Sequence, residues 1–149
     1  IAVSTPILTE YRSIRNKYGK IWLSIMVRKK RVHRIDEVED AALRYYLDEC
    51  TRGHCPISQC QNFFQKIEED IHLLETALKS NNLIISNERN CRDKIREVVT
   101  DCALNEQFQK LCGLVWIRPI ENCDIIDVFV LINDGHITEL HQNFKLIID

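Results

Sequence analysis

The chain has 149 residues, of which 45% are hydrophobic and 28% charged, and its formal net charge at pH 7 is −2. This size and hydrophobic content suffice for a sizeable core in one domain, and the small net charge argues neither for nor against nucleic acid as a partner. No apolar stretch approaches the roughly 20 residues of a membrane span and no signal-peptide pattern is present, so the sequence excludes a spanning helix and predicts a cytoplasmic protein.

The start of the chain alternates between strand and helix signals. Residues 1–3 are short and strand-like, and Ser4 or Thr5 can cap the helix that follows. This helix carries Glu10 in its second turn, near the carboxyl end of the strand. A second helix, both apolar and basic, is predicted over residues 20–29.

Positive charge is concentrated near the amino terminus. Residues 11–35 contain no Asp or Glu but nine of the twenty Lys and Arg residues, including the run Arg28, Lys29, Lys30 and Arg31. Residues 36–49 are acidic by contrast. A basic surface beside a carboxylate cluster suits a phosphate backbone, so this run is a candidate substrate-binding segment. A solvated helix face or a nuclear-localisation-like patch explains the run equally well.

The next helix is predicted from a capping pattern. Asp36 followed by Glu39 resembles a capping box, which predicts a helix through Leu47. A loop containing Gly53 and Pro56 follows.

Seven cysteines form no regular framework. Most fall on apolar faces of predicted helices, which indicates free thiols in a reducing compartment. The alternative is a zinc site, although no Cys-x-x-Cys pair is present; its ligands would be Cys50, His54, Cys55 and Cys60.

The most informative segment is residues 69–92. Apolar residues at helical spacing predict a helix through Leu78 with Asp70 in its first turn. Residues 83–85 are typical of a buried parallel strand, and Ser86, Asn87 and Glu88 follow at its carboxyl end. Ligands bind at this edge of α/β sheets, so we expect Asp70 and Glu88 to converge there. A dipole-stabilising Asp and a solvated Glu are the alternative.

The rest of the sequence, from residue 90 on, continues the alternation of helix and strand signals. Asn90 is expected to cap a helix that continues in a second one to Leu111, closed by Gly113, and residues 115–117 are strand-like. A final helix is predicted over residues 124–134. Repeated strand and helix units predict a single domain over residues 1–149, an α/β fold with a three-layer α/β/α sandwich and a mostly parallel central sheet.

These motifs resemble a known family. Asp70 with Thr76-Ala77-Leu78, the strand, and Ser86-Asn87-Glu88 are similar to the third and fourth acidic motifs of PIN (PilT N-terminal) domain nucleases. The segment STPILTEY, ending at Tyr11, is similar to the second motif and supplies Glu10. The segments LVWIRP and LINDG resemble the closing strand and helix of prokaryotic PIN-like proteins.

The resemblance implies a chemistry. It implies a nuclease whose Mg²⁺ or Mn²⁺ is held by Glu10, Asp70 and Glu88, which are hard oxygen ligands. Ser86 and Asn87 would position a phosphate or a water, and Arg92 would hold a phosphate unless it pairs with Asp93. The substrate it implies is RNA rather than DNA, and such domains often act as toxins or defence nucleases, form homodimers, and are restrained by a partner protein.

The chain departs from the family pattern at its start. PIN domains begin with a strand that delivers a first Asp, and nothing precedes Ile1; because the only methionine is Met26, we expect the natural start to lie upstream. The run 144–149 has the form of a strand followed by an Asp, but we assign Asp149 no role. Glu88 also stands where the family usually has Asp.

Two further hypotheses stay open. One is a catalytically inactive PIN-like module that binds nucleic acid or a partner protein. The other is a nucleotide- or effector-binding α/β domain, against which stands the absence of a glycine-rich phosphate loop among only four glycines. The five histidines are scattered and show no base–nucleophile pattern.

Overall fold

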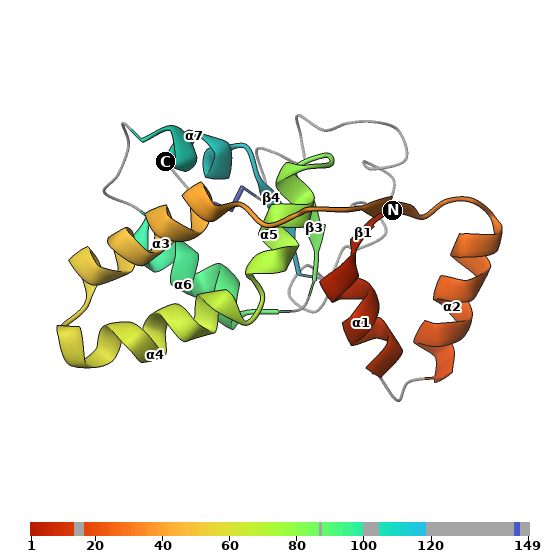
Figure 1. The fold of residues 1–149 in the computed structure, drawn as a ribbon, viewed down its shortest axis with the longest axis horizontal. Helices are drawn as coiled ribbons and strands as arrows, with labels where there is room; N and C mark the ends of the chain where they lie inside the picture. Colours follow the sequence, from red (N-terminus) through yellow and green to blue (C-terminus); the bar gives the residue numbers. More distant parts are fainter. Residues whose placement is uncertain (14–16, 87, 100–104, 119–144, 147–149) are drawn as a thin grey trace.

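The computed structural model describes residues 1–13, 17–86, 88–99, 105–118 and 145–146 (Figure 1). Within these residues the protein is mixed α/β, with short strands and longer helices. The elements in chain order are β1 (Ala2–Ser4), α1 (Thr5–Ser13), α2 (Lys17–Arg28), β2 (His33–Ile35), α3 (Ala41–His54), α4 (Ile57–Glu68), α5 (Ile71–Leu78), β3 (Leu83–Ile85), α6 (Asn90–Val98), α7 (Glu106–Cys112) and β4 (Val115–Ile117).

The described strands form two parallel pairs. β1 pairs with β2, with Val3 opposite Arg34, and β3 pairs with β4, with Ile84 opposite Trp116. Parallel pairs joined through helices are what the alternating pattern predicts, so the α/β class is confirmed. The two pairs are separate two-stranded sheets within the described residues.

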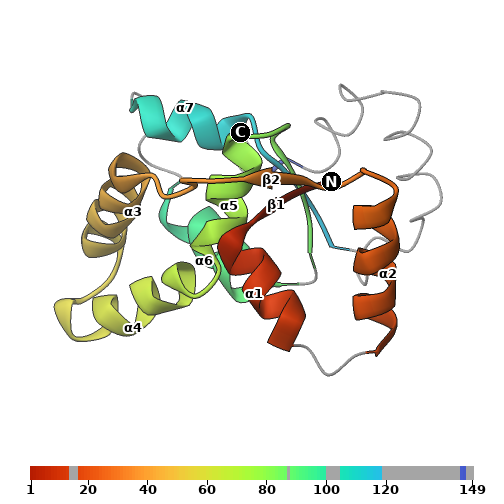
Figure 2. The same ribbon diagram turned by 45° about the vertical axis from the view of Figure 1, so that its right-hand side comes forward.

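Helix α5 connects the two pairs. It packs against both β1 and β3, with α3, α4 and α6 gathered on one side of it and α1 and α2 on the other (Figures 1 and 2). In its apolar stripe Ile71 and Leu74 are buried and Leu78 is partly buried, as the helical spacing predicts. The core continues from this stripe through α3, α4 and α6 to Trp116 on β4.

An internal ion pair fixes α5 against α3. The Glu75 carboxylate, whose side chain is 0% exposed, accepts hydrogen bonds from Arg44 Nε at 2.7 Å and Arg44 Nη2 at 3.0 Å. It also accepts one from the backbone N–H of Asp40 at 3.0 Å. A buried carboxylate needs such partners to stay charged, and these hydrogen bonds raise the pKa of Arg44 despite its partial burial.

Most strand and helix predictions are confirmed, but the predicted start of α3 is wrong. The helix begins at Ala41 and its cap is Asp40, whose Oδ1 accepts from Leu43 N; Asp36 instead pairs with Arg34 at 2.9 Å. The helix also continues past Leu47 to His54, so Gly53 lies inside it rather than in a loop. The bond from Asp40 N–H to Glu75 favours this later start, because it fixes the chain direction just before the helix.

Two further differences between the sequence-based expectations and the structure concern strands. β2 was not predicted, because its sequence is basic and mostly exposed and only its pairing with β1 identifies it. β3 is parallel as predicted but is not buried on both faces, since Ile85 is exposed. The predicted helix over residues 124–134, the junction of α6 and α7, and Asp149 lie outside the described residues.

Candidate functional site

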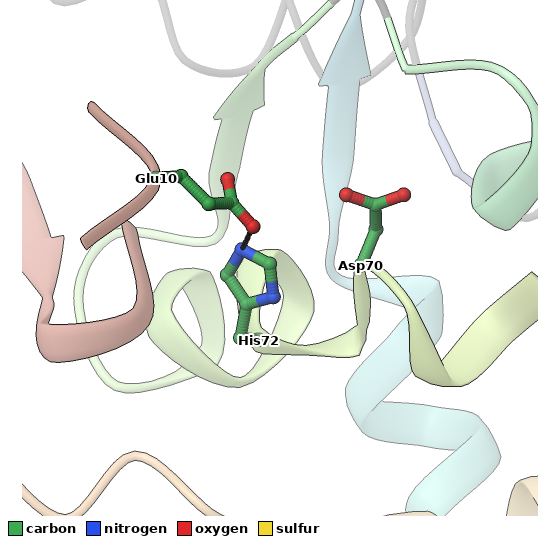
Figure 3. A group of neighbouring side chains, drawn as sticks. All are labelled: Glu10, Asp70 and His72. Atoms are coloured by element: carbon green, nitrogen blue, oxygen red, sulfur yellow. Dashed lines mark ion pairs between the residues drawn. The ribbon is translucent and has the colours of Figure 1, made fainter. Parts of the chain in front are cut away.

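Three side chains converge at the start of α5. Glu10 from α1, Asp70 just before α5, and His72 in its first turn each offer one ligand atom, and these atoms lie within 4.8 Å of one another. Figure 3 shows the carboxylate of Glu10 against the His72 ring, with Asp70 beside them. The group is an oxygen, oxygen, nitrogen set of the kind that holds a divalent metal ion. We refer to Glu10, Asp70 and His72 as the acidic cluster.

The fold explains this convergence. α1 begins directly after the carboxyl end of β1 and carries Glu10 in its second turn. α5 leads through a short turn into β3, against which it packs, so its first turn lies near the carboxyl end of that strand. Asp70 occupies the N-cap position of α5 but makes no side-chain capping bond, which leaves its carboxylate available to the cluster.

Electrostatics disfavour the charged form of Asp70. Burial raises the pKa of this carboxyl group above its ordinary value, and the negative charges of Glu88, Glu10 and Glu69 add to the effect, while His72 opposes it. Burial disfavours a charge of either sign, but the negative charges of the neighbouring carboxylates would stabilise a cation beside Asp70.

Sequence reasoning missed His72. It is only 6% exposed, and its Nε2 lies 3.2 Å from Glu10 Oε1 without making a hydrogen bond. Glu10 is an ion-pair partner of this nitrogen if the ring is protonated, but a buried polar atom that makes no hydrogen bond costs about 1–3 kcal/mol. The histidines show no base–nucleophile pattern, and the signal that identifies His72 is its position two residues after Asp70, at the same end of one helix.

Glu88 lies close enough to influence Asp70 but does not belong to the acidic cluster. Its carboxylate caps α6, accepting from Asn90 N at 2.7 Å and from Cys91 N at 2.9 Å. The prediction that Asn90 caps this helix is therefore wrong, since Asn90 is its first residue. Glu88 does add negative charge near Asp70.

Among the remaining predicted site residues, Ser86 and Arg92 make structural contacts, and Asn87 is not among the described residues. Ser86 Oγ accepts from Glu88 N at 3.1 Å, a turn that shapes the exit from β3. Arg92 pairs with Asp93 at 3.0 Å, and hydrogen bonds from Arg89 and Arg92 lower the pKa of Asp93 despite its partial burial. Asn87 lies outside the described residues.

The basic run 28–31 is exposed and precedes the amino end of β2. Glu10 instead follows the carboxyl end of β1, the parallel partner of β2. The run and the acidic cluster therefore belong to opposite ends of this strand pair.

Arg28, the first residue of this basic run, nevertheless lines a groove together with the residues that follow Glu10. A groove of about 430 Å³ between α1 and α2 is lined by apolar residues and by three cations, Arg12, Lys20 and Arg28. Tyr11, the residue after Glu10, also lines it. Cations and an aromatic ring along an open groove suit a single-stranded nucleic acid. We refer to this feature as the α1–α2 groove.

The zinc alternative is not supported by the described residues, where the acidic cluster is the only group of metal-ligand geometry. Cys55 Sγ and Cys60 Sγ are in contact at 2.8 Å, but Cys50 and His54 do not complete a site with them. Cys55, Cys60 and Cys91 are free thiols, as predicted.

Two findings concern the chain as a whole. Among the helices that the structure describes, none is long and apolar enough to cross a membrane. Comparison of the chain with protein-family models, curated proteins and solved structures gives no significant match.

Proposed function

We propose that the protein is a metal-dependent nuclease that hydrolyses phosphodiester bonds, with RNA as the preferred substrate, and that its fold is a PIN-like three-layer sandwich. The observation that carries this proposal is the acidic cluster, whose three ligand atoms lie within 4.8 Å of one another. Its supports in the fold are the two parallel strand pairs and the packing of α5 against both β1 and β3.

Each part of the site has a role in this proposal. Glu10, Asp70 and His72 hold the ion, and Glu88 contributes negative charge beside them. A Mg²⁺ or Mn²⁺ ion bound there would supply a Lewis acid and an activated water for attack on phosphorus. The cations of the α1–α2 groove bind the phosphate backbone on one side of Glu10.

A second candidate is a binding module without catalysis. One observation favours it: both carboxylate oxygens of Glu88 are engaged in capping α6, so this expected ligand is already used by the fold. In that case the groove binds nucleic acid and the cluster cuts nothing.

A cleavage assay tests the proposal. Labelled single-stranded RNA and DNA are incubated with the protein and Mn²⁺, Mg²⁺ or EDTA. We expect metal-dependent cleavage, faster for RNA, that is lost in Asp70→Asn. The matched control is Glu69→Gln, because Glu69 is an adjacent exposed acid paired with Lys66. Binding without cleavage by the wild type under either metal would favour the second candidate.

A further inference from the structure

The buried ring nitrogen of His72, Nε2, indicates which kind of metal ion the acidic cluster would bind. The residue lies in the first turn of α5 and is nine-tenths buried, and its Nε2 makes no hydrogen bond in the described structure. Glu10 Oε1 is 3.2 Å away but is not aligned with the ring nitrogen for a hydrogen bond. The nitrogen is thus held beside two carboxylates, and these do not satisfy it by hydrogen bonding.

The spacing of the cluster suits coordination. Ligand bonds to a first-row transition ion are about 2.0–2.2 Å, so two ligands on opposite sides of the ion are about 4.2 Å apart. The three atoms here lie within 4.8 Å of one another, which requires only a small inward movement. Two carboxylates balance the charge of a divalent ion, and Glu88 adds a further negative charge nearby.

The type of ligand distinguishes between metals. Mg²⁺ prefers oxygen ligands and retains several waters, whereas imidazole nitrogen suits divalent transition metals such as Zn²⁺, Fe²⁺ and Ni²⁺, among which Mn²⁺ binds least tightly. We infer that the acidic cluster binds a divalent transition-metal ion through His72 Nε2 and discriminates against Mg²⁺. The inference rests on the metal site of the proposed function but does not depend on whether that site cleaves a nucleic acid.

Calorimetric titration of the purified protein with MnCl₂ and MgCl₂ tests the inference. We expect wild-type protein to bind Mn²⁺ at least tenfold more tightly than Mg²⁺. His72→Gln should weaken Mn²⁺ binding at least tenfold and leave Mg²⁺ binding within twofold of wild type. The matched control is His54→Gln on α3, because His54 is exposed and pairs with Glu97 at 3.3 Å; it should change neither affinity.

A second measurement does not depend on a buried variant folding. Pulsed electron paramagnetic resonance of the wild-type protein with one equivalent of Mn²⁺ should show nitrogen-14 hyperfine coupling from a coordinated imidazole. Bound Mn²⁺ without this coupling, equal affinities for the two ions, or no Mn²⁺ binding would each overturn the inference. Mn²⁺ binding through nitrogen with no cleavage of RNA or DNA would overturn the nuclease proposal alone, and cleavage supported equally by Mg²⁺ and unaffected in folded His72→Gln would overturn the metal inference alone.

Discussion

The buried pair between Arg44 and Glu75 offers the clearest quantitative test of the fold, because it joins α3 to the helix that begins at the acidic cluster. Arg44→Met leaves the Glu75 carboxylate, 0% exposed, with a single hydrogen bond from Asp40 N–H. Breaking a buried ion pair by removing one partner costs about 3–5 kcal/mol, so we expect a loss of that size. Glu75→Leu should cost less, about 2 kcal/mol, because the Arg44 side chain is 32% exposed and water can reach the cation.

The free energy of unfolding of the double variant shows whether the two side chains depend on each other. Replacing both partners by apolar residues of similar volume removes the desolvated charges together, so the double variant should lie within about 1 kcal/mol of wild type. The sum of the two single costs should therefore exceed the cost of the double variant by at least about 4 kcal/mol. Urea unfolding, followed by circular dichroism at pH 7, measures the free energy of unfolding of the wild type, the two single variants and the double variant. Equal m-values would show that all four expose the same surface on unfolding.

A surface pair serves as the control for this cycle. Lys66 and Glu69 are 3.3 Å apart but half exposed, and Lys66→Met should change the free energy of unfolding by less than about 0.5 kcal/mol. Single costs below about 1 kcal/mol at Arg44, or additive costs in the double variant, would refute the argument that this pair is desolvated and interdependent.

Four further predictions concern the site and its surroundings. Because burial and then the charge of Glu88 raise the pKa of Asp70, the folded state binds this proton more tightly than the unfolded state, and stability falls as pH rises from the ordinary aspartate pKa to the raised one. Asp70→Asn should therefore raise the urea midpoint at pH 7 while abolishing metal binding, and a lower midpoint would contradict this. Glu88→Ala should cost about 1 kcal/mol in urea unfolding through loss of the α6 cap, and an unchanged midpoint would show that the two capping bonds contribute nothing. Partial burial and the hydrogen bond to Cys60 raise the pKa of Cys55 to about 11, so its alkylation by iodoacetamide, followed by mass spectrometry, should accelerate about tenfold per pH unit up to pH ~10, whereas a plateau below pH ~9 would contradict the raised pKa. Neutralising the three groove cations (Arg12→Gln, Lys20→Gln, Arg28→Gln) should lower the slope of log affinity for single-stranded RNA against log salt by up to about 2, whereas the matched set Lys29→Gln, Lys30→Gln and Arg31→Gln should leave it nearly unchanged, and equal losses would show that the groove is not the binding surface.

Local patterns predicted most of the helices and strands, and the failures occurred where a distant residue decides the outcome. The strands at residues 83–85 and 115–117 were predicted with their observed bounds, because short apolar runs between turn signals leave few alternatives. The start of α3 was placed too early, because Glu75, 35 positions further along the chain, binds the Asp40 backbone. β2 depends in the same way on its pairing with β1.

The sequence predicts only part of the site, again because contacts between distant segments decide the rest. Glu10 lies on the helix that follows β1, and Asp70 caps the helix that leads into β3, so both residues lie near the carboxyl end of a strand, where ligands bind in α/β sheets. The role of Glu88 was harder to predict, because a carboxylate before a helix serves equally well as a cap and as a ligand. The sequence does not predict His72 as a ligand, because it is the packing of α1 against α5 that buries the His72 ring beside Glu10.

A cation bound as proposed would account for several unfavourable features of the acidic cluster at once. Asp70 is held where its charged form is disfavoured, His72 Nε2 is buried without a hydrogen bond, and Glu88 adds further negative charge nearby. Each of these features costs stability in the metal-free chain, and none contributes to the core, which is formed by the apolar stripe of α5 and its neighbours. An ion present at 100 times its dissociation constant would stabilise the fold by about 2.7 kcal/mol, which is comparable to the cost of one unsatisfied buried polar group. The buried pair with Arg44 at Glu75 holds α5 in place, whereas the start of the same helix carries the partly buried Asp70 and the buried His72, whose charges and ring nitrogen a bound cation would stabilise.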